Sequence, residues 1–297
     1  MTSPICRLCP RACGVKRSQA DLGFCGADRQ VRVARAALHQ WEEPCISGSK
    51  GSGTVFFSFC NLRCKFCQNY PVSRGQVGRA VSQERLAGIF LELQRQGAHN
   101  LNLVTPTHYL QEIIPALESA KASGFNLPVI YNTGGYECVE TLETLRGVVD
   151  VFLPDLKFAT EETAKALANA ADYFQVATAA IRKMAELAGG CSFTPDGLMT
   201  RGLIVRHLVL PGKTAESRIV LKWIKDELPQ WVMVSLMGQY IPQGEVVGDD
   251  PLGRSLTQQE YDSVVEYLLE LGLENGYVQE LSSASDEFIP AFDLTGV

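Results

Sequence analysis

The chain has 297 residues, of which 46% are hydrophobic and 20% charged, and its formal net charge is -6. This balance is typical of a globular protein with a sizeable core, and the negative charge argues against bulk attraction to nucleic acid. No apolar stretch approaches the about 18–20 residues of a membrane-spanning helix, and Met1 is followed by no apolar signal-peptide core. We therefore expect a cytoplasmic protein that binds neither membrane nor nucleic acid.

The first 50 residues differ in composition from the remainder of the chain. They hold five of the ten cysteines and show little amphipathic periodicity. Gly and Ser dominate residues 47–53, which predicts a flexible joint or a tight loop at the end of this region.

From residue 54 onward, predicted strands alternate with predicted helices. The strands are expected at 54–59, 101–104, 128–131, 148–153, 203–210 and 231–236. Helices are expected at 82–96, 110–117, 136–146, 160–188 and 215–228, with a last one around 261–269. In the first of these helices, apolar residues recur at i, i+3, i+4 and i+7 from Leu86, and Ser82 is a suitable N-cap.

Six β-α units in series predict a parallel sheet covered by crossover helices. We expect an α/β protein whose sheet curls into a partial (β/α)6 TIM-like barrel and carries a Cys-rich amino-terminal extension. A doubly wound open sheet is the alternative. The expected divisions are a metal-binding extension at 1–50, the barrel at 51–281 and a carboxyl-terminal tail at 282–297. In either fold, a site would lie at the carboxyl ends of the strands.

The cysteines after the first predicted strand form the central motif. In a reducing compartment, clustered cysteines more often bind metal or act in catalysis than form disulfides. Cys60, Cys64 and Cys67 have the spacing C-x3-C-x2-C, and three thiolates on one loop can bind three irons of a [4Fe–4S] cluster. No fourth cysteine follows nearby, so one iron would keep an open position. A structural zinc knuckle is the alternative, although zinc prefers four protein ligands.

The amino-terminal cysteines form a second cluster. Cys6, Cys9, Cys13 and Cys25 offer four thiolates, which suit tetrahedral zinc or a second iron–sulfur cluster. Zinc is slightly favoured because the cysteines are paired at short spacings, and a disordered segment or free thiols are the alternative. The three scattered cysteines are expected to be buried small side chains, with Cys45 as a spare ligand; they are Cys45, Cys138 and Cys191.

The motif C-x3-C-x-aromatic-C after the first strand resembles the radical S-adenosylmethionine (SAM) superfamily, over about residues 53–240. The resemblance implies that the amino and carboxylate groups of SAM chelate the fourth iron. An electron donor such as flavodoxin or ferredoxin would reduce the cluster, which would then cleave SAM to a 5′-deoxyadenosyl radical for hydrogen abstraction. It also implies that Phe66 lies near the adenine and that Asn69 contacts the cofactor.

A closer similarity is to PflX-type homologues of the pyruvate formate-lyase activating enzyme. The stretches that carry it are residues 9–15 (CPRACGV), 41–48 (WEEPCISG), 66–70 (FCQNY) and 104–108 (VTPTH). The resemblance implies activation of a glycyl radical protein. The alternatives are radical modification of another peptide, protein or small molecule, and a non-enzymatic iron–sulfur electron-transfer protein.

Residues at the ends of later strands resemble cofactor contacts of the activating enzymes. Asp155 and Lys157 match an Asp-x-Lys whose lysine lies near the cofactor carboxylate, and Arg206 matches the arginine of Arg-x-x-x-x-Pro-Gly. Asn132 would bond the ribose. Since side chains alternate along a strand, we expect Arg206 to point inward and His207 to sit under a helix.

Two departures from the family pattern affect the site. The usual Gly-Gly-Glu after the second strand is replaced by residues 105–108, so Thr105 and Thr107 are the expected contacts for the cofactor's ammonium. After the sixth strand, residues 235–240 lack the histidine that activating enzymes carry nearby.

Overall fold

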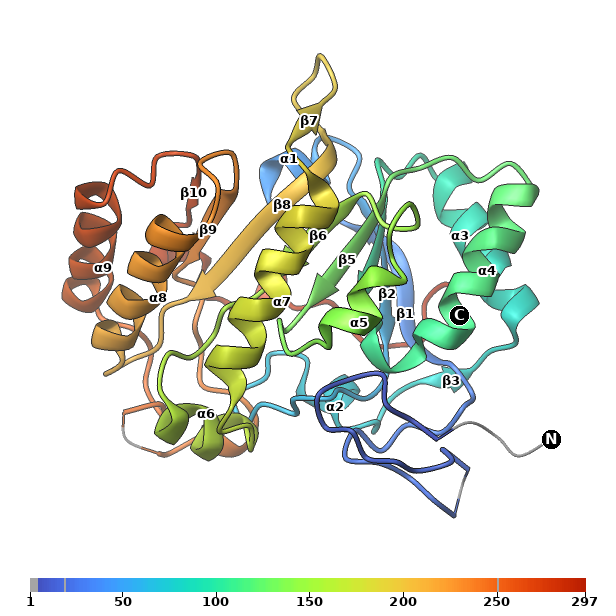
Figure 1. Ribbon diagram of the computed structural model, residues 1–297, viewed down its shortest axis with the longest axis horizontal. Helices are drawn as coiled ribbons and strands as arrows, with labels where there is room; N and C mark the ends of the chain where they lie inside the picture. Colours follow the sequence, from blue (N-terminus) through green and yellow to red (C-terminus); the bar gives the residue numbers. More distant parts are fainter. Residues whose placement is uncertain (1–4, 19, 250) are drawn as a thin grey trace.

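The computed structural model describes residues 5–18, 20–249 and 251–297 (Figure 1). In this part of the chain one mixed sheet contains all the strands. The strands are β1 (Arg32–His39), β2 (Ser52–Phe57), β3 (Arg79–Ala80), β4 (Leu101–Val104), β5 (Val129–Thr133), β6 (Val151–Pro154), β7 (Ser192–Phe193), β8 (Met199–Leu208), β9 (Met233–Met237) and β10 (Gly276–Val278).

The helices connect successive strands. They are α1 (Pro44–Ser47), α2 (Tyr70–Ser73), α3 (Gln83–Arg95), α4 (Leu110–Ala122), α5 (Val139–Glu143), α6 (Glu161–Ala168), α7 (Tyr173–Ala188), α8 (Thr214–Glu227) and α9 (Gln258–Glu270). Short 3-10 helices occur at Thr107–Tyr109, Gly244–Val246, Leu281–Ser283 and Asp286–Phe288. Ser82 caps α3 as expected, because its hydroxyl accepts a hydrogen bond from the Arg85 amide at 3.1 Å.

The strand order distinguishes between the two expected folds. It runs β10-β9-β8-β6-β5-β4-β2-β1-β3, and the strands from β2 to β10 along this path pair in parallel. A doubly wound sheet reverses its order at a switch point. Here each successive parallel strand is added beside the previous one, always at the same edge of the sheet, and the first and last strands do not pair to close a barrel. The prediction of a partial TIM-like barrel is confirmed.

All six predicted parallel strands are present, but the sequence pattern did not predict β1, β3, β7 or β10. β1 pairs with β2 in antiparallel fashion, so residues 32–39 of the amino-terminal extension belong to the sheet. Its sequence, RVARAALH, places Arg32 and Arg35 among the apolar residues and blurs the alternation. Charged side chains of this kind are common on strands near a sheet edge.

The sheet buries both of its faces. Val55 and Phe57 of β2 pack against α3 and α4 on the outer face, so Phe56 between them points to the inner, concave face. Inside the curve, Cys45 and Ile46 of α1 pack against side chains of β5, β6, β8 and β9. α1 lies at the amino ends of the strands, at the end of the sheet opposite α2 (Figure 1), and forms a floor for the concave space.

The carboxyl-terminal segment, residues 279–297, crosses from one edge of the sheet to the other. It leaves β10 and passes behind the sheet in Figure 1, and Thr295 accepts a hydrogen bond from the Ala36 amide of β1 at 2.8 Å. On the way, Phe288 packs against Trp41, with ring centroids 4.7 Å apart, and Phe292 packs against Phe56 at 5.3 Å. The segment therefore lies across the concave side.

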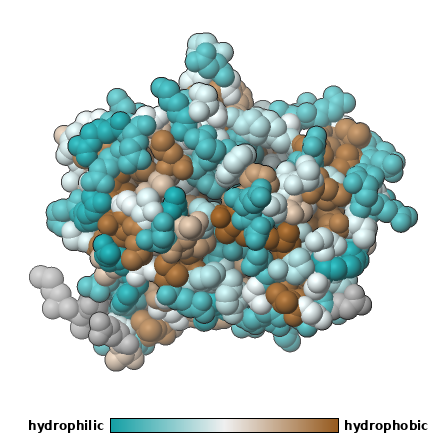
Figure 2. Space-filling model, turned by 180° about the vertical axis from the view of Figure 1, so that it is seen from behind, coloured by the Kyte–Doolittle hydropathy of each residue, from teal (hydrophilic) through white to brown (hydrophobic). Residues whose placement is uncertain are grey.

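The face seen from behind in Figure 2 shows hydrophobic side chains across its middle, among hydrophilic ones.

In the described residues, no helix is long and apolar enough to cross a membrane.

Candidate active site

The cysteine loop begins directly after β2 at the carboxyl end of the sheet. Its backbone is anchored where the Lys65 amide donates to the Leu167 carbonyl at 2.9 Å. Cys64 is buried, and Cys60 and Cys67 are partly exposed. Burial raises the pKa of the Cys64 thiol to about 12. The positive charge of Lys157 opposes this rise in pKa, whereas Cys60 and Cys67 add to it. The three sulfurs therefore lie within each other's electrostatic reach, with one cation beside Cys64.

A network of charged side chains fills the inner face just below this loop. Arg206 donates from Nε to Asp155 at 2.8 Å, from Nη1 to Glu42 at 3.1 Å and from Nη2 to Asn132 at 2.6 Å. The Lys157 ammonium lies 2.5 Å from the other Asp155 oxygen. Burial opposes ionisation of Asp155, but Arg206 and Lys157 outweigh it and lower the pKa of this carboxyl. The expected residues of three different strand ends therefore meet in one network.

The carboxylate of Glu42 was not among the expected site residues. It accepts hydrogen bonds from Asn102 at 2.9 Å and from Asn132 at 3.3 Å, in addition to that from Arg206. Glu42 precedes α1, so it reaches the network from the floor. The only signal in the sequence was its place in the stretch 41–48, and periodicity cannot show that a segment folds back into the sheet.

Two buried acceptor atoms beside Glu42 have no hydrogen-bond partner in the described structure: Glu43 Oε2 and Asn102 Oδ1. Glu43 is 8% exposed and Asn102 is 0% exposed. Burial raises the pKa of Glu43, and Arg206 opposes this while Glu42 adds to it. A hydrogen bond with Ser235 also opposes the rise, so the carboxyl of Glu43 is partnered on one side only.

The other expected cofactor contacts lie in different surroundings. Thr105 donates to the Asn132 carbonyl at 3.3 Å, which joins it to the network. Phe66 packs edge-on against Phe158 at 5.9 Å within the outer core. Asn69 occupies the N-cap position of α2. The structure therefore brings Asn132, Asp155, Lys157, Arg206 and Thr105 together, and places Phe66 and Asn69 to one side.

Thr107 belongs to a separate buried cluster around Glu137. The Glu137 carboxylate accepts hydrogen bonds from Thr107 at 2.7 Å, from Tyr131 at 3.2 Å and from Thr133. Burial raises the pKa of Glu137 to about 7, with these donors opposing the shift. The sequence analysis missed Glu137, which lies four residues beyond β5. Thr107 is thus already bonded within the protein.

Glu137 should make the stability of the protein depend on pH. The pKa of Glu137 is about 7 in the folded protein and about 4.3 in the unfolded chain. The folded state is therefore stabilised by the protonated carboxyl fully below pH 4.3, and this stabilisation is lost as pH rises through 7. We expect the free energy of unfolding to fall by about 2–3 kcal/mol between about pH 5 and 8 from this group. Glu137→Gln should remove that fall, measured by urea unfolding across the range. If the free energy of unfolding falls equally with pH in the wild type and in Glu137→Gln, the fall does not come from Glu137.

His207 lies on the opposite face of β8 from Arg206, as the alternation predicted. Its Nδ1 lies 2.7 Å from the Leu156 carbonyl and its Nε2 2.9 Å from the Ser217 hydroxyl of α8. Burial lowers its pKa to about 4, so this is a neutral side chain packed under a helix.

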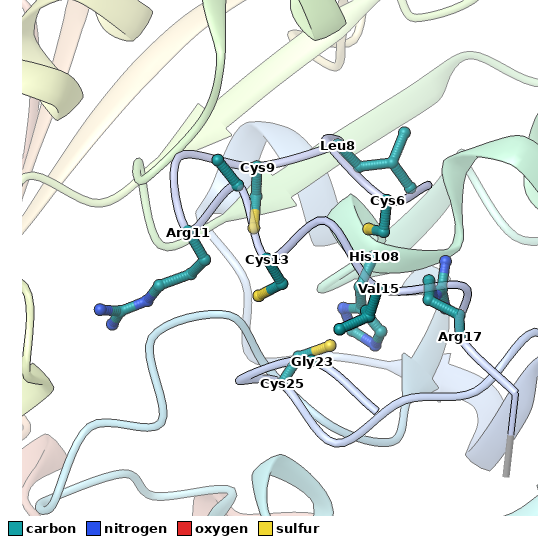
Figure 3. A pocket seen from close by; sticks show the side chains of 11 residues that line it. Cys6, Leu8, Cys9, Arg11, Cys13, Val15, Arg17, Gly23, Cys25 and His108 are labelled. Carbon is teal, nitrogen blue, oxygen red and sulfur yellow. The ribbon is translucent and has the colours of Figure 1, made fainter. Parts of the chain in front are cut away.

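The amino-terminal cysteines surround a small cavity (Figure 3). Cys6, Cys9, Cys13 and Cys25 line it together with His108, and its volume is about 20 Å³. Burial raises the pKa of Cys9 to about 12, and Cys6 and Cys25 add to the rise. In the portion of the chain described, no three His, Cys, Asp or Glu side chains are arranged to hold a single metal ion.

Arg11 joins this segment to the cysteine loop of the barrel. Its Nε donates to the Asn61 carbonyl at 2.9 Å, and its Nη2 donates to the Ala168 carbonyl at 2.8 Å. Its guanidinium lies 3.8 Å from the centre of the Phe24 ring, and Arg63 donates to the Phe24 carbonyl at 3.2 Å. The amino-terminal segment is therefore docked on the loop that carries Cys60, Cys64 and Cys67.

Comparisons with known proteins agree with this architecture. Residues 54–223 match the family described as the Radical SAM superfamily. The uncharacterized protein MJ0674 of Methanocaldococcus jannaschii is 28% identical over 271 residues, which cover 88% of this chain and 73% of that protein.

Two crystal structures share the fold. One is Streptococcus suis SuiB bound to its precursor peptide SuiA, with a TM-score of 0.50 and 14% identity over 78% of this chain. The other is HydG, a maturase of the [FeFe]-hydrogenase, with a TM-score of 0.51 and 12% identity over 77% of this chain. The matches span 49% and 52% of those longer chains, so the likeness concerns the fold alone.

Proposed function

Because the chain belongs to the radical SAM superfamily, we propose that Cys60, Cys64 and Cys67 bind a [4Fe–4S] cluster with one open iron, used to cleave SAM and abstract hydrogen from a substrate. In this family the reduced cluster supplies the electron that converts SAM to methionine and a 5′-deoxyadenosyl radical. The observation that carries the proposal is the position of the three thiols at the end of β2, with the Lys157 ammonium close enough to oppose the raised pKa of Cys64. Thiolates are the ligands that iron–sulfur clusters use.

The residues around the loop fit a cofactor with both a carboxylate and a ribose. Lys157 is held beside Asp155 and can face the carboxylate of SAM, and Asn132 and Thr105 lie at neighbouring strand ends for the ribose and amino group. Arg206 already donates to three partners, so we propose that it orients Asp155 and Asn132. For Phe66, Asn69 and Thr107 the proposed cofactor contacts rest on the resemblance.

One experiment tests this reaction against a non-enzymatic electron-transfer role. The protein is reconstituted with iron and sulfide under anaerobic conditions and mixed with dithionite and SAM. We expect 5′-deoxyadenosine and methionine as products. A protein with a full cluster that forms neither would overturn the proposal. The physiological electron donor is proposed to be a flavodoxin or a ferredoxin.

For the target of the radical, the similarity of residues 9–15, 41–48, 66–70 and 104–108 to PflX-type homologues favours a glycyl radical protein. Incubation with candidate partners, SAM and reductant should then produce the EPR doublet of a glycyl radical. The enclosure of the concave side favours a second candidate, a small molecule. α1 forms a floor beneath the site and residues 279–297 cross its open side, so both would restrict the entry of a protein loop.

We propose further that the segment before β1 binds a metal through Cys6, Cys9, Cys13 and Cys25. Zinc and a second iron–sulfur cluster remain the two candidates. The cavity of about 20 Å³ favours a single ion, because that volume holds about one water-sized particle. Metal bound here would stabilise a region with few buried apolar side chains.

The identity of this metal can be tested with a triple variant, Cys6→Ser, Cys9→Ser and Cys13→Ser. Three lost thiolates should abolish tetrahedral binding, so we expect about one zinc per chain to be lost while the iron of the barrel cluster is kept. Metal content is measured by mass spectrometry after anaerobic purification. Loss of about four irons with no zinc in either protein would instead indicate a second cluster.

A further inference from the structure

The guanidinium of Arg11 joins two segments that lie far from it in the chain. Its Nε donates to the Asn61 carbonyl at 2.9 Å, its Nη2 donates to the Ala168 carbonyl at 2.8 Å, and its Nη1 donates to the Asn169 carbonyl. Ala168 is the last residue of α6 and Asn169 is its C-cap. The last carbonyls of a helix have no partner within the helix, and the helix dipole favours a cation there. Arg11 therefore binds the end of α6 and the cysteine loop at once.

The cysteine loop meets the same helix end at a second point. The Lys65 amide donates to the Leu167 carbonyl at 2.9 Å, so α6 receives hydrogen bonds from the loop as well as from Arg11. Lys65 directly follows Cys64, whereas Asn61 precedes it by three residues. The buried Cys64 is therefore flanked by two anchors on one helix end, and the anchor at Asn61 depends on Arg11.

A reciprocal contact runs from the loop to the amino-terminal segment. Arg63 donates to the Phe24 carbonyl at 3.2 Å, and the guanidinium carbon of Arg11 lies 3.8 Å from the centre of the Phe24 ring. Arg63 has a φ of 54°, in the left-handed region that is uncommon for residues other than glycine. Such a conformation persists where the surrounding structure holds it, and it often occurs at functional sites. The loop between Cys60 and Cys64 therefore relies on contacts from outside itself.

The position of this loop matters because the proposed contacts for SAM lie on other elements. Asn132 belongs to β5, and Asp155 and Lys157 follow β6. Ion pairs and hydrogen bonds, with Arg206 or with one another, hold these side chains in place. The cluster ligands must be aligned with this fixed set. A misplacement of about 1 Å at reacting groups can lower a rate about 100-fold.

We propose that Arg11 is a positioning residue for the barrel cluster: by tying Asn61 to the end of α6, it fixes the loop that carries the cluster ligands. The inference rests on the proposed radical chemistry and names the residue through which the amino-terminal segment acts on that site. Arg11 lies within the stretch 9–15, so the fold of that segment determines where the guanidinium lies.

The first measurement is hydrogen–deuterium exchange of the amides of residues 60–70, in the full-length protein before the cluster is reconstituted. Arg11→Met removes the charge and all three hydrogen bonds, so we expect these amides to exchange about 10-fold faster than in the wild type. Arg11→Lys keeps the charge but has no planar fork of donors, and its exchange rates should lie between the two.

Arg218→Met is the matched control for this measurement. Arg218 also donates to a main-chain carbonyl, that of Ser263 at 3.2 Å, and its guanidinium carbon lies 4.9 Å from the centre of the Tyr267 ring. These contacts join α8 to α9, away from the cysteine loop (Figure 1). Residues 60–70 of this variant should exchange as in the wild type.

The second measurement uses the same variants after reconstitution to equal iron content. The EPR spectrum of the reduced cluster is recorded with and without SAM, and the formation of 5′-deoxyadenosine is followed at saturating SAM. In the wild type, SAM should convert the spectrum fully. We expect Arg11→Met to give a mixture of SAM-bound and SAM-free spectra and to cleave SAM about 10- to 100-fold more slowly. Arg11→Lys should recover part of both properties. A contact that serves stability alone would leave the spectrum of the loaded protein unchanged.

Three results would overturn the inference. One is exchange in Arg11→Met equal to that of the wild type, and another is faster exchange with an unchanged spectrum and cleavage rate. The third is an equal effect of Arg218→Met. SAM cleavage by the wild type is measured in the same preparations. If the fully loaded wild type forms no 5′-deoxyadenosine, the proposed function fails; if it does and Arg11→Met behaves like it, only the role of Arg11 fails.

Discussion

Replacing Cys64 with serine should eliminate the barrel cluster and reduce SAM cleavage to the level without protein. Cys64 is the buried member of the three, and Lys157 is the cation that most favours its thiolate. A serine hydroxyl is a harder ligand with a much higher pKa than a thiol, so it binds the iron of a cluster far more weakly than a thiolate does. Mutation of a residue that only hydrogen-bonds to a metal ligand typically lowers metal affinity or activity about 10- to 100-fold. Loss of the ligand itself should have a larger effect.

The experiment compares iron and sulfide content, visible absorption and 5′-deoxyadenosine formation after identical reconstitution. Cys191→Ser is the matched control, since the Cys191 thiol donates to the Trp231 carbonyl at 3.4 Å, far from the cysteine loop along the chain. The control should keep full iron and full cleavage. A Cys64→Ser protein that holds a complete cluster and cleaves SAM would show that Cys64 is not a ligand.

Local patterns were sufficient to predict the architecture. Each of the six expected parallel strands is an apolar run followed by a helical stripe, and this information is contained in neighbouring residues. The same holds for the Ser82 cap, and for the division of β8 between Arg206 on the inner face and His207 beneath α8. Periods of 2 and 3.6 residues specify which side chains share a face.

Contacts between distant segments could not be predicted in this way. Glu42 and Arg206 are 164 residues apart in the chain, and no periodicity indicates that the segment before α1 turns into the concave space. The same limit applies to Thr107, whose hydrogen bond to Glu137 no sequence pattern indicated. Polar residues at strand ends can be recognised from sequence, but the partner that each one takes depends on how the loops return.

These long-range contacts change how the arginine of the site should be understood. A free arginine at a strand end would be a simple clamp for a carboxylate. Arg206 is instead the centre of a buried network that ties β5, β6 and β8 to the floor. Its main contribution is therefore expected in the stability and geometry of the inner face, and only through these in cofactor binding.

Arg206→Met should accordingly destabilise the protein by about 3–5 kcal/mol near pH 7, because it leaves the buried Glu42 without its cationic partner and Asp155 paired with Lys157 alone. Arg206→Lys keeps the charge but cannot form the three hydrogen bonds in their present directions, so a smaller loss of about 1–3 kcal/mol is expected. The free energy of unfolding is measured by denaturant titration of both variants and the wild type.

The dependence of this loss on pH identifies its cause. In the wild type the pKa of Asp155 is lowered, so its stabilisation is present above the unfolded pKa of about 3.9 and is lost as pH falls. In Arg206→Met, loss of the guanidinium should raise the pKa of Glu42 further, and should raise that of Asp155 by less because Lys157 remains beside it. That variant therefore gains stability as these carboxyls become protonated. The difference between the two proteins should therefore shrink as pH approaches about 4. A difference below about 1 kcal/mol at neutral pH, or one that stays constant down to pH 4, would show that Arg206 is not their countercharge.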